Sequence, residues 1–365
     1  MRIAYLSLHW PRAISSSIGK KILNQISFWK KAGNEVEFFS HLHNGKEKNQ
    51  LLDGKKAIYA IKPFFWKTEQ NRIQAAKEIL RKIEGYKPDL IYLRWGMYVH
   101  PLSQLSKIAP MIVEINTNDK KEHRRLDIFL HLYNTATRGI FLVNADGHVY
   151  TSAEFAALDI FSKYQKPYRI ISNGINLSSI HPFHAPHNDT PHLLFVGTPG
   201  MEWHGVEKLV TFAEKYPDVI VDLVGYDFIH GLSIPKNMVL HGYLSGQAYQ
   251  NVLKKADAAI GTLALYKKEM QEASPLKIRD CAARGIPCIL PYKDTDLYDL
   301  TCDQILQIPN APDNIQTHGE DMHRFLFKMR GQRIPRDIIA DRISSEKKES
   351  DRLSFFSMVI DQKKA

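Results

Sequence analysis

The chain has 365 residues, of which 44% are hydrophobic and 24% charged, and its formal net charge is +10. This length exceeds what one hydrophobic core usually serves, so two domains are expected, and no apolar run reaches the roughly 18 residues of a membrane span. Three cysteines without paired spacing fit a reducing compartment, so we expect a cytoplasmic protein. The charge favours anionic partners such as nucleotides or an anionic membrane surface, although an ordinary solvated basic surface explains it equally well. The basic residues are dispersed and form no nucleic-acid-binding motif, which argues against nucleic acid.

The chain opens with the pattern of a doubly wound α/β domain. Residues 2–8 have the apolar weight of a β-strand, and apolar residues recur at helical spacing over 18–33. A second strand is expected over 35–41, which completes a strand–loop–helix–strand order. The loop at 15–21, which contains Gly19, follows the first strand at its carboxyl end, where such sheets bind ligands. It contains no P-loop, and an ordinary capped turn accounts for it equally well.

The following strands end at candidate ligand-contacting side chains. A strand over 88–94 places Arg94 at a sheet edge, where it could meet an anionic ligand or form a structural salt bridge. A strand that begins at Pro110 ends near Asn116, and Asp119 follows in the loop. The same segment offers further polar candidates, each more often a solvated loop residue: Glu114, Glu122 and His123.

Composition divides the chain into two halves. Residues 1–172 are expected to form the first domain, and 173–190, rich in His, Pro, Ser and Asn, a linker. Residues 191–342 repeat the α/β pattern as a second domain, and the tail is expected to be an amphipathic helix over about 336–362. Further helices are expected over 69–84, 153–164, up to 215 and 245–255, and further strands over 146–152, 168–172, 192–197, 219–225, 238–241 and 258–263.

The most informative stretch runs from Glu272 to Pro287. Ser274 suits the N-cap of a short helix and Pro275 its first position, while Gly285 suits the left-handed residue after its end. A buried strand is expected over 286–290. The helix start, with its unpaired N–H groups and positive dipole end, is a ready site for phosphate.

Three charged residues accompany this helix start. Glu272 precedes it, Lys277 lies in its first turn, and Asp280 follows. An acid, a phosphate-binding helix end, a cation and a second acid suit a nucleotide sugar. The alternative is a helix with local ion pairs, because Asp280 has the spacing to pair with Lys277 or with Arg284.

At these residues the chain resembles the retaining glycosyltransferases of family 4, which have the GT-B fold. Their signature is a Glu, seven residues, a second Glu, a run of small residues and Gly-x-Pro. Glu272 takes the first place and Asp280, a departure, takes the second. Ser172 to Asn176 also resembles the element that ends the first domain in that family. The resemblance implies two doubly wound Rossmann-like domains facing a central cleft, with the C-terminal helix, about 343–365, packing back on the first.

The resemblance also implies a donor site in the second domain. Glu272 would face the donor sugar, Asp280 the nucleotide ribose, and Lys277 the diphosphate. The helix start would bind the same diphosphate through the segment Ser274, Pro275 and Leu276.

Other donor-side positions depart from the family pattern. Relatives carry an Arg after the strand glycine, here Gly197, and a Lys before a later glycine, which together clamp the diphosphate. Thr198 and His204 stand there, so Lys277 and a protonated His204 would have to substitute. Gly242 and Tyr243 follow a strand where relatives contact the nucleobase.

The first domain would hold the acceptor. Gly19, Arg94 and Asp119 would lie on that side, and Asn116 takes the place where many relatives have an active-site histidine. An asparagine cannot serve as an acid or base, but it can donate a hydrogen bond to a sugar hydroxyl.

We therefore expect a glycosyltransferase that moves a sugar, with retention, from a UDP- or GDP-type donor to a glycan, lipid-linked or small-molecule acceptor. No cofactor and no metal are expected, because no HExxH motif is present and the helix start with Lys277 can stabilise the departing diphosphate. The process would be polysaccharide or glycoconjugate biosynthesis, and peripheral contact with an anionic membrane is compatible with the charge.

Two alternatives stay open. A sugar-nucleotide epimerase or hydrolase of the same fold would turn over the donor without an acceptor. A non-catalytic sugar-nucleotide-binding partner would explain why four positions depart from the family pattern: Asn116, Thr198, His204 and Asp280.

Overall fold

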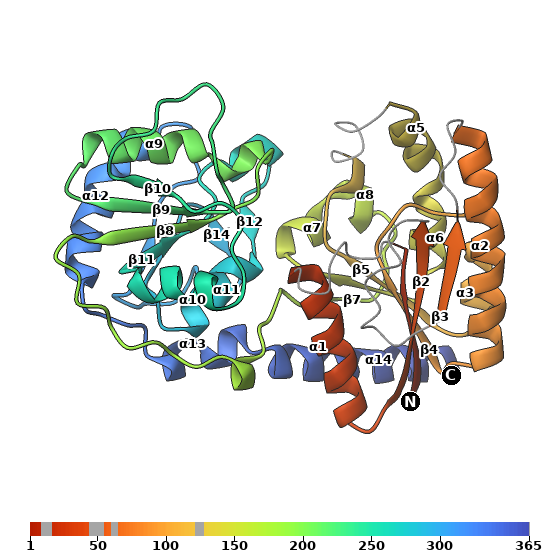
Figure 1. The fold of residues 1–365 in the computed structure, drawn as a ribbon. Coiled ribbons are helices and arrows are strands. Elements are labelled where there is room, and N and C mark those ends of the chain that lie inside the picture. Colours follow the sequence, from red (N-terminus) through yellow and green to blue (C-terminus); the bar gives the residue numbers. More distant parts are fainter. Residues whose placement is uncertain (9–16, 44–54, 60–64, 121–127, 365) are drawn as a thin grey trace. The chain divides into compact units, whose positions relative to one another are not determined.

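The computed structural model describes residues 1–8, 17–43, 55–59, 65–120 and 128–364. The chain divides into two compact units (Figure 1). Unit 1 comprises Met1–Ser172 and Ser345–Ala365, and unit 2 comprises Asn173–Ser344. Glu122, His123 and residues 15 and 16 of the expected loop at 15–21 lie outside the described residues, whereas 17–21 begin a helix and are not a loop.

Unit 1 contains a seven-stranded sheet in the order β3-β2-β1-β4-β5-β6-β7, and every neighbouring pair is parallel. The order reverses between β1 and β4, as in doubly wound folds. Its strands are β1 (Arg2–Ser7), β2 (Glu35–His43), β3 (Lys55–Tyr59), β4 (Leu90–Arg94), β5 (Met111–Ile115), β6 (Gly147–Tyr150) and β7 (Tyr168–Ile170).

Helices flank this sheet, whose central strands β1, β4, β5 and β6 are almost completely buried. Trp29 of α1 and Phe356 of α14 pack with Tyr5 and Tyr92 of the strands into one aromatic cluster, while α2 packs on β2 and β3. The helices of unit 1 are α1 (Ser17–Lys31), α2 (Phe65–Tyr86), α3 (Leu105–Ile108), α5 (Ile128–Thr137), α6 (Gly139–Asn144), α7 (Ala153–Ala157), α8 (Asp159–Ser162) and α14 (Ser345–Lys364), with a 3₁₀ turn η1 (Leu102–Gln104).

Unit 2 contains a six-stranded parallel sheet in the order β10-β9-β8-β11-β13-β15, and its order reverses between β8 and β11. A separate pair, β12 and β14, is also parallel. Its strands are β8 (His192–Val196), β9 (Ile220–Val224), β10 (Met238–Leu240), β11 (Ala258–Ile260), β12 (Glu272–Ala273), β13 (Cys288–Leu290), β14 (Lys293–Asp294) and β15 (Ile305–Gln307).

Two cores lie on opposite faces of the unit 2 sheet, because side chains alternate along each strand. Leu193 and Phe195 of β8 join one core with α9 and α12, and Leu194 joins the other with α10, α11 and α13. The helices are α9 (Val206–Lys215), α10 (Gly246–Lys255), α11 (Leu276–Ala283), α12 (Asn314–Met329) and α13 (Arg336–Ile343), with 3₁₀ turns η2 (Leu177–Ser179), η3 (Glu202–His204) and η4 (Leu265–Lys268).

Two expected helices are interrupted. The helix expected over 153–164 is broken at Leu158, whose extended backbone (φ −66°, ψ 127°) separates α7 from α8. The tail helix is broken at Ser344 (φ −60°, ψ 124°), so α13 belongs to unit 2 and α14 to unit 1. Serine competes for backbone hydrogen bonds and is weak in helix interiors, which fits a break at this position.

Residues 173–190, expected as a linker from composition, make their contacts within unit 2. Ile180 is buried, and the backbone N–H of Phe183 donates to the carbonyl of Arg284 at 2.9 Å.

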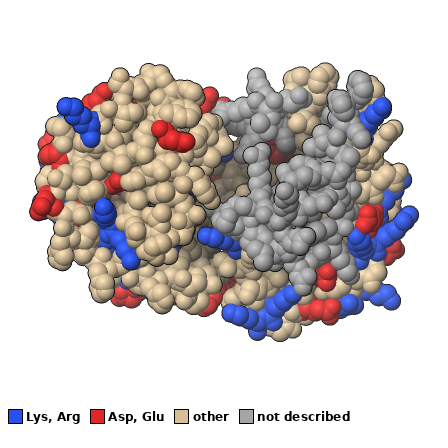
Figure 2. Space-filling model, in the orientation of Figure 1, with Lys and Arg blue, Asp and Glu red and all other residues tan. Residues whose placement is uncertain are grey.

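On the face drawn in Figure 2, Lys and Arg side chains are dispersed among acidic ones.

Candidate functional site

The reversal of strand order in unit 2 brings two predicted loops to one edge of its sheet. Thr198 and His204 lie in the connection that follows β8, and α11, with Lys277, comes after β11. Because β8 and β11 are parallel neighbours, the connections that leave their carboxyl ends diverge at one place. This switch point is where open α/β sheets bind ligands.

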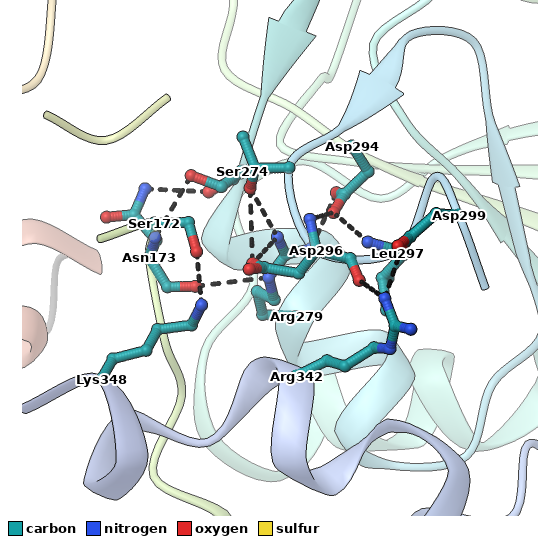
Figure 3. A network of polar contacts seen from close by, with 11 residues as sticks. Ser172, Asn173, Ser274, Arg279, Asp294, Asp296, Leu297, Asp299, Arg342 and Lys348 are labelled. Carbon is teal, nitrogen blue, oxygen red and sulfur yellow. Dashed lines mark hydrogen bonds and ion pairs between the residues drawn. The ribbon is translucent and has the colours of Figure 1, made fainter. Parts of the chain in front are cut away.

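Helix α11 begins one residue later than predicted. Pro275 is its N-cap residue with no side-chain capping bond, and Leu276 is the first helical residue. Ser274 is therefore not the cap: its hydroxyl oxygen accepts from the backbone N–H of Asn173 at 3.2 Å, and its carbonyl accepts from the Asn173 amide at 2.8 Å (Figure 3). The predicted end is confirmed, since Gly285 follows the helix at φ +84°.

The start of α11 keeps unused donors. Within the described residues, the backbone N–H groups of Leu276 and Lys277 donate no hydrogen bond, as is general for the first turn of a helix. The half-buried Lys277 ammonium forms no ion pair with a described carboxylate, and burial lowers the pKa of Lys277 to about 8. A desolvated cation beside free N–H groups is an incomplete electrostatic arrangement that an anion would complete.

Lys208 of α9 provides a useful contrast. Burial also lowers the pKa of Lys208 to about 8, but its ammonium donates to the carbonyls of Leu263 (3.2 Å) and Ala311 (2.8 Å) and to the side-chain oxygen of Asn314 (2.9 Å). Lys208 is therefore satisfied by neutral oxygens and holds α9 to the start of α12.

His204 is a neutral imidazole. It is buried, and desolvation together with nearby Lys277 lowers the pKa of His204 to about 3. Its Nδ1 lies 2.8 Å from the hydroxyl of Tyr226, and that hydroxyl donates to the carbonyl of Thr198 at 2.9 Å. A protonated His204 in a cationic clamp stays a prediction for the ligand-bound protein; in the free protein its charged form is disfavoured, because the buried ring sits next to a lysine and has no carboxylate partner among the described residues.

A second cation approaches the β8–α9 connection instead. The ammonium of Lys268, on η4, lies 4.2 Å from the ring centroid of Trp203, and Lys268 also contributes to the lowered pKa of His204. Sequence reasoning missed Lys268. The run Tyr266-Lys267-Lys268 gave the only signal, but nothing local distinguishes Lys268 from Lys267, which pairs with Glu207 at 2.7 Å.

Arg279 anchors α11 from its buried side. Its guanidinium is fully buried and binds Asp294 at 2.7 Å and Asp296 at 2.6 Å, as Figure 3 shows. Its Nε also donates to the carbonyl of Asn173 at 3.3 Å. The helix start is thus fixed to β14 and to the first residues of unit 2, which preorganises its N–H groups.

The two predicted acids both have partners. Glu272, on β12, is buried, and its carboxylate binds the ammonium of Lys293 at 2.8 Å. Asp280 accepts from Arg284 at 3.1 Å and from the hydroxyl of Tyr249 at 3.3 Å. The i,i+4 pair with Arg284 is the one that local spacing predicted, so a ribose hydroxyl would share this carboxylate with it.

Glycines allow close backbone approach beside this edge. Gly225 has φ +97°, and a side chain there would lie 2.3 Å from the carbonyl oxygen of Gly197. The N–H of Gly225 donates to the carbonyl of Gly242 at 2.6 Å. The ring of Tyr243 is 80% exposed, so it is open to stacking by a planar ligand.

Unit 1 places a charged cluster at its own switch point. The Lys21 ammonium, on α1 close to Gly19, binds the Glu114 carboxylate, and a guanidinium nitrogen of Arg94 lies 3.4 Å from the same carboxylate. The side-chain oxygen of Asn116 accepts from both terminal nitrogens of Arg94 at 3.2 and 3.1 Å. Gly19 is buried in the first turn of α1.

Two acids of unit 1 are interior rather than ligand-facing. Glu114, expected to be a solvated loop residue, is fully buried on β5. Asp119, predicted on the acceptor side, is 3% exposed, and its carboxylate oxygens accept from Arg138 at 2.7 and 2.9 Å and from Asn134 at 2.6 Å. These contacts favour a structural ion pair for Asp119.

Among the described residues, no group of three or more His, Cys, Asp or Glu side chains could hold a metal ion. None of the described helices is both long enough and apolar enough to cross a membrane.

No family model matches the chain. No curated protein matches it in sequence. Solved structures match it almost end to end. Sucrose-phosphate synthase from Thermosynechococcus elongatus matches with a TM-score of 0.72 over 99% of both chains at 15% identity. The lipopolysaccharide outer core galactosyltransferase WaaB matches with a TM-score of 0.68 over 98% of this chain and 100% of its own, at 16% identity.

HepE from Anabaena, solved with UDP and glucose, matches with a TM-score of 0.62 over 98% of this chain and 100% of its own, at 12% identity. At such identities the likeness defines the fold alone. The predicted fold is confirmed: two doubly wound α/β units of the GT-B class.

Proposed function

We propose that the chain is a glycosyltransferase that uses a nucleotide-sugar donor. The observation that carries this proposal is the start of α11 at the switch point of unit 2, where backbone N–H groups and the desolvated Lys277 have no partner in the described part of the chain. This arrangement favours a diphosphate. The GT-B fold, shared with neighbours whose names describe sugar transfer, adds support from analogy.

The donor site would lie entirely in unit 2. The N–H groups of Leu276 and Lys277 and the Lys277 ammonium would bind the diphosphate, with Lys268 as a second cation. Neutral His204 would accept a hydrogen bond from a hydroxyl of the donor with its second ring nitrogen, because Nδ1 donates to the Tyr226 hydroxyl. The remaining donor contacts carry over from the sequence prediction: Gly197 and Thr198 beside the diphosphate, Glu272 at the sugar, Asp280 at the ribose, Gly242 and Tyr243 at the base, and Ser274 and Pro275 at the loop before α11.

Lys277 would stabilise the departing diphosphate. Breaking the bond between the sugar and its phosphate leaves a negative charge on the leaving oxygen, and preorganised donors aimed at developing charge lower the barrier. A bound diphosphate also favours the charged form of Lys277, reversing the effect of burial. We propose that this chemistry proceeds with retention and without a metal or other cofactor.

The acceptor side would lie in unit 1. Arg94, Asn116 and the turn at Gly19 gather at its switch point, whereas the carboxylate of Asp119 is engaged by Arg138. A glycan, lipid-linked or small-molecule acceptor is proposed, in polysaccharide or glycoconjugate biosynthesis. Peripheral contact with an anionic membrane also belongs to the proposal, and the exposed apolar side chains of α5 and the net charge of +10 support it.

A non-catalytic nucleotide-binding partner is the second candidate. In the free protein the Asn116 amide is engaged by Arg94 and the charged form of His204 is disfavoured, so the hydrogen-bond donor and the clamp cation expected at these positions are both weakened. Such a partner would bind a nucleotide sugar at the same donor site without catalysing its turnover. An epimerase or hydrolase would consume the donor without an acceptor.

The test is a thermal-unfolding panel of UDP, GDP, dTDP and CMP on wild type, Lys277→Ala and the matched control Lys255→Ala, an exposed lysine of unit 2. A nucleotide at a hundred times its dissociation constant should stabilise the protein by about 2.7 kcal/mol. We expect UDP or GDP to stabilise wild type and Lys255→Ala, and the effect to disappear in Lys277→Ala. If every nucleotide leaves wild type unchanged, the donor site is wrong. Binding without turnover of any nucleotide sugar would favour the non-catalytic partner.

A further inference from the structure

Unit 1 buries more positive than negative charge in one connected cluster. Arg352 of α14 forms an ion pair with Glu349 at 2.5 Å, so each of these two charges has its own partner. Lys21 and Arg94, in contrast, share the single carboxylate of Glu114. The described members of the cluster are therefore three cations and two carboxylates: Lys21, Arg94 and Arg352, with Glu114 and Glu349.

Both oxygens of the shared Glu114 carboxylate already have partners. One oxygen of Glu114 contacts Lys21 and Arg94, and the other accepts from the hydroxyl of Tyr92 at 2.8 Å. Burial alone would raise the pKa of Glu114, but Lys21 and Arg94 hold that pKa well below its usual range. The carboxylate is therefore ionised, yet one charge cannot neutralise two.

The excess positive charge of Lys21 and Arg94 is desolvated, but both side chains keep some solvent exposure. The side chain of Glu114 is 0% exposed and that of Lys21 8%, while Arg94 reaches outward at 13%. The outward partner of Arg94 is the neutral amide of Asn116. A buried cation without a counter-charge is costly, because protein interiors solvate ions poorly.

The position of the cluster suits a ligand. Lys21 lies in the helix that follows β1, and Arg94 ends β4, so the two flank the point where the strand order of unit 1 reverses. Helix α1, 15 residues long, has no acidic residue in its first turn. Its positive dipole end therefore adds to the potential of the two cations.

We infer that Lys21, Arg94 and Asn116 form a subsite for an oxyanion, and that the acceptor carries a phosphate or carboxylate group there. This deepens the proposed function and rests on it, because it names the chemical class of the acceptor. Arg94 can bind an oxyanion through two N–H groups, and the Asn116 amide can turn its N–H₂ group towards the same ligand. Glu114 is a positioning residue that keeps both cations in place.

The subsite is tested in the full-length Lys277→Ala protein, so that the probes do not report on the donor site. Thermal unfolding is followed with glycerol 1-phosphate and with glucuronate. Neutral glycerol and glucose serve as ligand controls, each at ionic strength matched with sodium chloride. Stabilisation by glycerol 1-phosphate identifies a phosphate group, and stabilisation by glucuronate alone identifies a carboxylate.

Asn116→Asp is the decisive variant. It is nearly isosteric and places a carboxylate beside Arg94, which supplies the missing counter-charge within the protein. We expect it to raise the melting temperature without ligand and to lower the affinity for the stabilising anion at least tenfold. Arg94→Gln should lose the same affinity, whereas Arg81→Gln, at an exposed arginine of the same unit, should retain it.

The inference is overturned if neither anion stabilises more than its neutral counterpart, or if Asn116→Asp still responds fully. Asn116→Asp keeps the test interpretable should Arg94→Gln fail to fold, because it removes no buried ion pair. The nucleotide panel on wild type is a separate readout. A nucleotide response without an anion response rejects the oxyanion subsite alone, and the reverse rejects the donor site alone.

Discussion

At the scale of single residues, the candidate site is defined by Lys277, a cation that has no acidic partner among the described residues. The half-buried Lys277 is desolvated without a described carboxylate, whereas the fully buried Arg279 is compensated by Asp294. An uncompensated charge costs stability, and such costs concentrate at functional sites. The contrast between these two neighbours on α11 separates a ligand-binding lysine from a structural arginine.

Nucleotide binding should weaken as pH rises through about 8. The pKa of Lys277 is lowered to about 8 in the free protein, so the side chain is charged below that pH and neutral above it. A diphosphate binds the charged form, and at pH 9 about a tenth of Lys277 carries the proton. Isothermal titration of UDP should therefore give an affinity about tenfold lower at pH 9 than at pH 7.

Lys277→Arg supplies the control for this pH dependence. An arginine stays charged throughout this range, so its affinity should be nearly constant between pH 7 and 9. An equally steep loss in Lys277→Arg would assign the pH dependence to another group.

Residue identities and local spacing predicted which positions gather at the site. They did not predict the hydrogen bonds or protonation states of those residues. Gly285 ends α11 as its freedom at positive φ requires. The cap at Ser274 was misjudged, and the burial of His204 was not foreseen, because their partners are distant: Asn173 lies 101 residues from Ser274 in sequence, and Tyr226 lies 22 from His204. A capping bond and a protonation state depend on such contacts, which no local pattern contains.

At the scale of elements, α11 owes its position to buried ion pairs rather than to a cap. Its first turn lacks a side-chain capping bond, so the helix start is held by Arg279 on one side and by the contacts between Asn173 and Ser274 on the other. Strong periodic patterns predicted β1, α1 and the strand after α11. The breaks at Leu158 and Ser344 escaped prediction because neither position carries a glycine or proline that would mark the end of a helix.

Removing the Arg279 guanidinium should destabilise unit 2 strongly. Arg279→Ala leaves Asp294 buried without its partner, and breaking a buried pair in this way costs about 3–5 kcal/mol. The exposed pair of Arg324 and Asp321 on α12 gives a matched control, and Arg324→Ala should cost less than about 1 kcal/mol. Urea unfolding of both variants measures the difference, and similar losses for the two would contradict the anchoring role.

At the scale of the whole molecule, unit 1 exposes a group of apolar side chains, and the chain carries a net charge of +10. Ile128, Phe129 and Leu132 of α5 are 59%, 69% and 58% exposed. Exposed apolar side chains on a basic protein favour the surface of an anionic bilayer, because burial of the former and attraction of the net charge add together.

Flotation with vesicles tests this surface. The protein should float with phosphatidylglycerol vesicles and not with phosphatidylcholine vesicles, and added salt should release it because exposed charges are screened. Phe129→Glu should weaken binding at least tenfold, since it removes an apolar contact and adds a repelled charge. Phe228→Glu, which alters a similarly exposed phenylalanine (55%) of unit 2, should bind like wild type. Equal loss of binding in both variants would show that net charge, and not the α5 surface, causes the effect. Equal binding to neutral and anionic vesicles would show that electrostatic attraction does not contribute.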